Sequence, residues 1–147
     1  FFFFFDYAHT NDAMEKLVTS VKDLNPKIVI TVFGCGGDRD ASKRPLMGEV
    51  AANYSDIVFV TSDNPRTENP DLIIADIVAG MGGHMHKTKV VPDRESAIRE
   101  AVELASSGDI VVLAGKGHEN YQIIGKEKRH FDDREMAAKY ISIKEAR

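Results

Sequence analysis

After its first five residues the chain alternates short apolar runs with longer amphipathic segments. Three runs rich in β-branched residues, KIVITVFG (27–34), DIVFVTS (56–62) and DIVVLAG (109–115), are typical of strands buried on both faces. Between them, apolar residues recur every three or four positions, which is typical of helices that pack on a sheet. The expected helices occupy residues 12–24, 44–55, 70–81, 94–107 and 132–141.

The first expected helix has recognisable start and stop signals. Thr10 or Asn11 is placed to cap its first turn, because either side chain can accept a hydrogen bond from a free backbone N–H. The pair Asn25-Pro26 ends it, since the residue before a proline avoids the helical region. Its apolar face is expected to consist of Leu17, Val18, Val21 and Leu24.

Two further segments predict short strands. TKVVPD (88–93) follows the third helix, and YQIIGKEKRHF (121–131) predicts two strands joined in a hairpin at Gly125. Strands that alternate with helices of ten or more residues form βαβ units, so the pattern indicates an α/β fold with a mostly parallel sheet between two helical layers. In such sheets, ligands bind beyond the carboxyl ends of the strands.

The composition narrows the possible classes of protein. A length of 147 residues suits one domain, and a net charge of −4 disfavours nucleic acid as a partner. The single cysteine, Cys35, excludes an internal disulfide and fits a reducing cytoplasm. No apolar run approaches the roughly 20 residues that a membrane helix needs. We interpret Phe1 to Phe5 as an artefact or a misassigned segment, standing where a native strand belongs, and assign them no function.

Four loops follow the expected strands at one edge of the sheet: DYAHTN (6–11), GCGGDRDASKRP (34–45), DNPRTENP (63–70) and GKGHEN (115–120). The second loop has three glycines in four residues, which permit close backbone approach to a ligand. It departs from the dinucleotide-binding fingerprint G-x-G-x-x-G, because the position of the third glycine, residue 39, is arginine. Arg39, Lys43 and Arg44 indicate an anionic ligand group, and a glycine-rich turn with solvated charges is the alternative.

The DNPR stretch of the third loop suits a zwitterionic ligand. It offers the guanidinium of Arg66, the amide of Asn64 and the carboxylate of Asp63 on a backbone that Pro65 stiffens. An arginine can bind a carboxylate through two parallel hydrogen bonds, and the carboxylate of Asp63 suits an ammonium. An amino acid would use all three groups. An ordinary polar turn is the alternative.

The fourth loop, GKGHE, lacks the phosphate-binding pattern G-x-x-x-x-G-K-[ST]. Gly115 and Gly117 allow a tight turn, which leaves Glu119 as an acceptor and predicts Lys116 and His118 as mobile donors. The alternative for His118, a surface histidine without a function, is equally consistent with the sequence.

The remaining candidates carry less information. Asp6 and His9 follow the first strand, where a role in helix capping is the alternative. His84 and His86 have no evident third ligand, so we expect no metal site. Cys35 has no evident base beside it and is interpreted as a packing residue.

Taken together, the loops resemble the carboxy-terminal domain of the Mur ligases, in particular the members that add diaminopimelate. The matching stretches are DYAHTNDAMEK, VFGCGGDRDASKRPLMG, SDNPRTENP and LAGKGHENYQIIG, which span nearly all of the chain after Phe5. The resemblance implies a Rossmann-like three-layer sandwich with one antiparallel strand. It makes residues 6–147 the amino-acid-binding domain, and it implies that the UDP-sugar and central ATPase domains are absent here.

The resemblance also implies roles for particular residues. Asp6 and His9 would lie near the nucleotide, and no residue of this domain is expected to be catalytic by itself. The residues implied for a meso-2,6-diaminopimelate pocket are Arg39, Asp63, Asn64, Pro65, Arg66, Gly115 and Glu119.

The implied enzyme is a cytoplasmic, monomeric ligase of peptidoglycan synthesis. It would join meso-diaminopimelate to UDP-MurNAc-L-Ala-D-Glu, with ATP and Mg²⁺ held by the other domains and neither bound to this domain alone. The isolated domain is expected to be inactive. A non-catalytic Rossmann-like module that binds a nucleotide or phosphate is the alternative.

Overall fold

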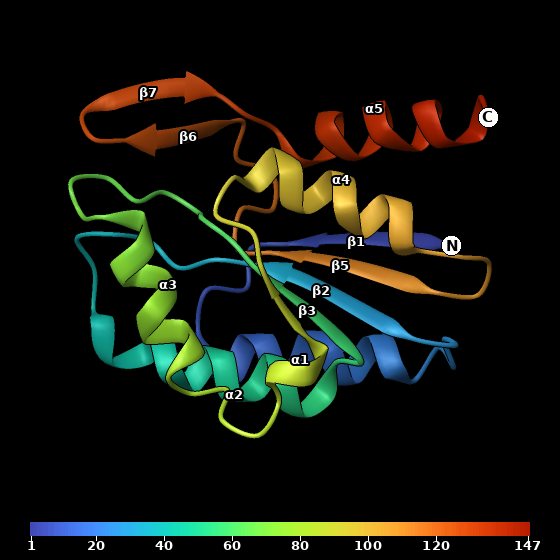
Figure 1. Cartoon of the computed structure of the whole chain (residues 1–147), viewed down its shortest axis with the longest axis horizontal. Coiled ribbons are helices and arrows are strands. Elements are labelled where there is room, and N and C mark those ends of the chain that lie inside the picture. Colours follow the sequence, from blue (N-terminus) through green and yellow to red (C-terminus); the bar gives the residue numbers. More distant parts are fainter.

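A five-stranded parallel sheet lies at the centre of the computed structural model, which describes residues 1–147 (Figure 1). The strand order is β1-β5-β2-β3-β4. In that order the strands span Phe2–Asp6, Ile110–Ala114, Val29–Phe33, Ile57–Val60 and Thr88–Val90. Every residue of β2 and β5 is buried, which confirms the prediction that these apolar runs are covered on both faces.

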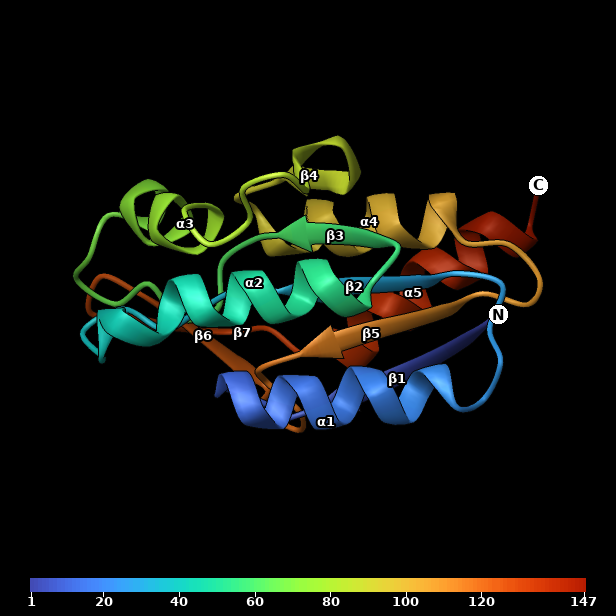
Figure 2. The ribbon, with the colours of Figure 1, turned by 90° about the horizontal axis from the view of Figure 1, so that it is seen from below.

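Helices cover the two faces of the sheet in separate layers (Figures 1 and 2). On one face lie α1 (Asn11–Lys22), α2 (Arg44–Tyr54) and α3 (Pro70–Val78), whose apolar side chains form one core cluster with the sheet. On the other face lie α4 (Arg94–Leu104) and α5 (Asp133–Glu145), which form the second cluster. Two short 3₁₀ helices are η1 (Ala41–Lys43) and η2 (Met85–Lys87).

The α1 helix follows its sequence signals closely. The Thr10 hydroxyl accepts a hydrogen bond from the backbone N–H of Ala13 at 3.2 Å, so Thr10 is the cap. Val18 and Val21 are buried as expected. Leu24 was wrongly placed on the buried face: α1 ends at Lys22, and Leu24 beyond it is 59% exposed.

The antiparallel pairing expected at Gly125 is present in a separate sheet. β6 (Tyr121–Ile124) and β7 (Glu127–His130) form a two-stranded hairpin, and Gly125 adopts a φ of 62° in its turn. This hairpin does not extend the main sheet, whose strand pairs are all parallel. The three-layer α/β architecture is confirmed, with its antiparallel strands outside the central sheet.

The amino-terminal phenylalanines occupy a strand position. β1 pairs in parallel with β5, with Phe2 opposite Ile110 and Asp6 opposite Ala114. A strand therefore stands where one was expected, while the interpretation of Phe1 to Phe5 as an artefact stays a prediction. None of the helices has the length and apolar character needed to cross a bilayer.

Candidate functional site

A cavity of about 340 Å³ lies where the loops after β1, β2, β3 and β5 meet. The carboxyl ends of parallel strands share one edge of the sheet, so loops far apart in sequence converge there. Six of the seven residues implied for the pocket line this cavity: Arg39, Asp63, Asn64, Arg66, Gly115 and Glu119.

The structure places Pro65 and Asp6 outside the cavity lining, while His9 is part of it. Pro65 acts through its backbone, because a Cβ on Gly37 would collide with the Pro65 carbonyl oxygen. Only glycine at position 37 lets these two loops approach so closely. The carbonyl of Asp6 accepts a hydrogen bond from the Gly115 N–H at 2.9 Å, which joins the loops after β1 and β5.

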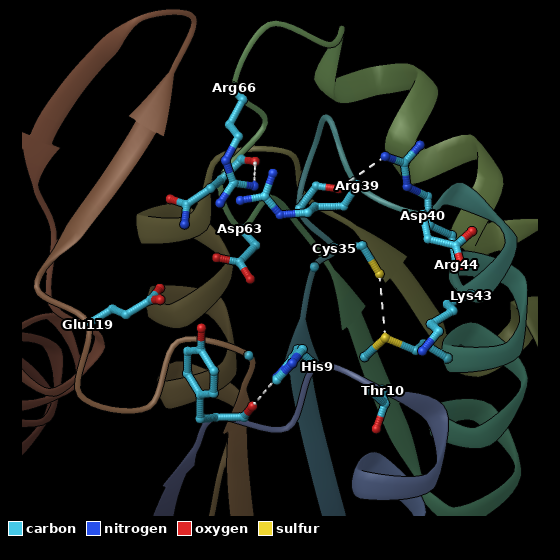
Figure 3. A pocket seen from close by; sticks show the side chains of 16 residues that line it. His9, Thr10, Cys35, Arg39, Asp40, Lys43, Arg44, Asp63, Arg66 and Glu119 are labelled. Atoms are coloured by element: carbon cyan, nitrogen blue, oxygen red, sulfur yellow. Dashed lines mark hydrogen bonds between the residues drawn. The ribbon is translucent and has the colours of Figure 1, made fainter.

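Three cationic side chains line the cavity without an ion-pair partner in the chain: Arg39, Lys43 and Arg66. Arg39 and Arg66 come from different loops, and their guanidinium groups point toward the same part of the cavity (Figure 3). Arg66 Nη1 donates to the Gly37 carbonyl at 2.9 Å, which leaves its other nitrogens without a partner. Arg66, held by this bond, and the exposed Arg39 therefore both present donors to an anionic group.

Two carboxylates face the same cavity. Asp63 is only 8% exposed, and its Oδ1 atom is buried without a hydrogen-bond partner. Burial raises the pKa of Asp63, although the positive charges of Arg94 and Lys116 act in the opposite direction. An unpaired buried carboxylate is costly, so its presence indicates a cationic ligand group that would satisfy it.

Glu119 faces the cavity opposite Arg39 (Figure 3). Its Oε2 atom accepts a hydrogen bond from the Tyr121 hydroxyl at 3.3 Å. The negative charge of Glu119 is the main cause that raises the pKa of the neighbouring Tyr7 phenol. The Glu119 Oε1 atom lies 3.9 Å from the Lys116 ammonium. The cavity thus combines cations without an ion-pair partner and one unpaired carboxylate, Asp63, which is an arrangement that suits a zwitterionic ligand.

Two predictions about cationic side chains were wrong. Arg44 lines the cavity, but it was expected to be available to an anionic ligand, whereas its buried guanidinium pairs with Glu68 at 2.9 Å and Asp76 at 3.0 Å. Lys116 was expected to be a mobile donor, but it is fully buried and donates to the Tyr121 carbonyl. Burial lowers the pKa of Lys116. Both side chains stabilise loops and are not free for a ligand, whereas His118 is exposed.

Cys35 packs as expected. Its thiol donates to the Met47 sulfur at 3.7 Å, and burial raises its pKa to about 12. A thiol with so high a pKa is a poor nucleophile at neutral pH. No group of three or more metal-ligating side chains is gathered anywhere in the chain, at His84 and His86 or elsewhere.

The DNPR segment is held in place by the β6–β7 hairpin. The Asn64 side-chain oxygen accepts from the Ile123 N–H at 2.9 Å, and the Arg66 N–H donates to the Ile123 carbonyl at 3.0 Å. The Gly125 N–H donates to the Arg66 carbonyl at 2.6 Å. Arg66 has a φ of 54°, a left-handed conformation that costs a non-glycine residue on the order of 1 kcal/mol. These contacts hold Arg66 in that conformation.

A buried ion pair behind the cavity was not predicted from the sequence. Arg94 binds both carboxylate oxygens of Asp133, at 2.8 and 2.7 Å, and neither side chain is exposed. Arg94 also donates to the carbonyls of Ser62 and Ala114, which directly precede the two loops that carry Asp63 and Gly115. Residues 94 and 133 are far apart in sequence, so no local pattern could have revealed the pair.

Comparison with known proteins identifies the family. The family model described as "Mur ligase, glutamate ligase domain" matches residues 1–117, well over half of the chain. The chain belongs to the Mur ligase family.

Relatives of this Mur ligase chain support the assignment. It is 53% identical over 137 residues to a UDP-N-acetylmuramoyl-L-alanyl-D-glutamate–2,6-diaminopimelate ligase of Clostridioides difficile (strain 630), covering 93% of this chain and 28% of the relative. The protein of the same name from Synechococcus elongatus is 57% identical over 132 residues, covering 90% and 26%. A solved structure of a protein with that name has a TM-score of 0.92 at 45% identity, covering 97% of this chain and 29% of the other. The Mur ligase chain thus spans less than a third of the relatives it matches.

Proposed function

We propose that this chain is the amino-acid-binding domain of an ATP-dependent ligase that adds meso-2,6-diaminopimelate to UDP-MurNAc-L-Ala-D-Glu in peptidoglycan synthesis. The observation that carries the proposal is one cavity in which Arg39 and Arg66 lack ion-pair partners while Asp63 is buried and unpaired. The names of the relatives support the same reading. ATP and nucleotide-linked sugars are cytoplasmic compounds, so the proposal places the enzyme in the cytoplasm.

The chemistry of diaminopimelate matches this distribution of charge. The molecule carries two ammonium and two carboxylate groups, which suit the two acidic side chains, Asp63 and Glu119, and the arginine pair. Lysine lacks the second carboxylate, so it would leave a guanidinium without a partner. Sites that bind a polar group can reject an analogue lacking it on the order of 10⁴-fold. The pocket should therefore select diaminopimelate over lysine.

In the proposed reaction, ATP phosphorylates the glutamyl carboxylate, an amine of diaminopimelate attacks the acyl phosphate, and phosphate leaves as the amide forms. This domain would hold the amine in reacting geometry, and such orientation supplies much of the rate. The chain gathers no set of metal-ligating side chains, so we assign it no step that involves Mg²⁺. ATP and the UDP-sugar would bind the parts of the enzyme that this chain does not span.

The proposal is tested by Arg66→Ala in the full-length ligase. Losing a charge-assisted pair with a carboxylate should raise the KM for diaminopimelate about 10- to 100-fold. Arg66→Lys should fail nearly as badly, because a point charge cannot form the planar fork. Arg99→Ala, which removes an exposed arginine from α4, is the matched control. An unchanged KM in Arg66→Ala would refute the pocket assignment.

A module that binds nucleotide or phosphate without chemistry is the second candidate. The absence of ion-pair partners at Arg39 and Lys43, both in the glycine-rich loop, favours it. Phosphate release by the full-length protein separates the two candidates. Release that depends on diaminopimelate supports the ligase, whereas ATP binding without diaminopimelate-dependent release supports the module.

A further inference from the structure

One buried side chain of the β6–β7 hairpin contacts the loop of residues 63–70, called here the pocket loop. Gln122 is 2% exposed, and its Nε2 atom donates to the Asp63 carbonyl at 2.8 Å. Its Oε1 atom accepts from Arg129 Nη2 at 2.7 Å. A guanidinium can only donate and a carbonyl can only accept, so these two neighbours fix which way the amide points.

The Gln122 bond is the start of a continuous set of contacts along the pocket loop. After the Asp63 carbonyl, the loop is joined to the hairpin at the side chain of Asn64 and at both backbone groups of Arg66. The other contacts use hairpin backbone, so Gln122 supplies the one side-chain donor from the hairpin to this loop. It therefore fixes the position of the residue that carries the unpaired carboxylate.

We propose that Gln122 is a positioning residue that sets selectivity for diaminopimelate by fixing Asp63 and Arg66 relative to each other. Gln122 does not line the cavity, so it acts through these two residues and not by touching the ligand. The inference rests on the proposed function of the chain. Its physical basis is that Gln122 ties Asp63 to the hairpin whose backbone groups, at Ile123 and Gly125, hold the left-handed Arg66.

The test compares variants of the full-length ligase. Gln122→Met keeps the side-chain length and removes the amide, so it should raise the KM for diaminopimelate on the order of tenfold. The KM values for ATP and the UDP-dipeptide should stay unchanged, and selectivity against lysine should fall. Gln122→Glu keeps the acceptor for Arg129 but loses the donor to Asp63, so it should behave like Gln122→Met.

Two surface variants complete the design. Arg129→Met removes an exposed side chain, should fold normally, and should raise the diaminopimelate KM a few-fold because the amide loses its fixed orientation. Glu127→Gln, on the same strand with an exposed side chain and no hydrogen bond, is the control and should match the wild type.

The outcomes separate the inference from the function on which it rests. If Arg66→Ala raises the KM but Gln122→Met and Arg129→Met do not, Gln122 is no positioning residue and the proposed function stands. If Arg66→Ala also leaves the KM unchanged, the proposed function itself fails. If Gln122→Met raised the KM equally for all three substrates and lowered the Tm, Gln122 would serve only folding, and the inference would be overturned.

Discussion

Replacing Arg94 by methionine should destabilise the chain by about 3–5 kcal/mol, because it leaves Asp133 buried and charged without its partner. Both carboxylate oxygens of Asp133 now receive a hydrogen bond from Arg94, and neither side chain is exposed to water that could replace it. The stability of a domain is only about 5–15 kcal/mol, so this single change should remove a large part of it.

The double variant Arg94→Met with Asp133→Leu separates the ion pair from the other contacts of Arg94. With both charges removed, no buried charge is left alone, and a buried pair replaced by apolar groups is often neutral. Part of the loss that remains comes from the carbonyls of Ser62 and Ala114, which lose their bonds to Arg94. The rest comes from Asp63, which loses the nearby positive charge of Arg94. At about 1 kcal/mol each, the two bonds account for roughly 2 kcal/mol of the loss that remains.

Urea unfolding of the wild type, both single variants and the double variant, followed by circular dichroism, gives the coupling energy of the pair. The expected result is a double variant that is more stable than Arg94→Met alone. A loss below about 1 kcal/mol in Arg94→Met, or a double variant whose loss equals the sum of the single losses, would refute the reasoning.

Two further predictions concern the cavity. Burial raises the folded-state pKa of Asp63, so this group contributes stability that is present below its unfolded pKa and lost as the pH rises through the folded pKa. Asp63→Asn should therefore raise the Tm at neutral pH and reduce the fall in stability with rising pH. It should also weaken diaminopimelate binding. A lower Tm at neutral pH would contradict this prediction. Gly37→Ala should cost about 1–3 kcal/mol and raise the diaminopimelate KM, because the added methyl collides with the Pro65 carbonyl. Gly82→Ala, where an added Cβ meets nothing within 4 Å, is its control in the same thermal and kinetic assays, and equal behaviour of the two would contradict the close approach at Gly37.

The sequence was sufficient to predict the layers and the edge at which the site forms. Apolar runs and amphipathic periods are local, so the helices and strands could be located within a few residues. Parallel strands share their carboxyl edge, so four loops could be brought together without a structure. That reasoning placed Arg39, Asp63 and Arg66 around one cavity.

Partners that are distant in sequence could not be predicted. Arg39 and Arg44 look alike in the glycine-rich loop, yet only Arg44 meets Glu68 and Asp76 from other elements. Lys116 looks mobile until the hairpin covers it. A cation's role depends on whether a carboxylate from another element reaches it, and no spacing along the chain encodes that contact.

The separation of the hairpin from the central sheet has a consequence for motion. β7 is entirely exposed, and β6 contributes little apolar surface to either core cluster. Local opening of such a segment costs much less free energy than global unfolding. The hairpin can therefore open while the layers beneath stay intact, and each opening would break its bonds to the DNPR segment. The bonds between that segment and Gly37 would remain. Assembly of the pocket and folding of the domain are thus separate equilibria, and a bound ligand would favour both the closed hairpin and the folded domain.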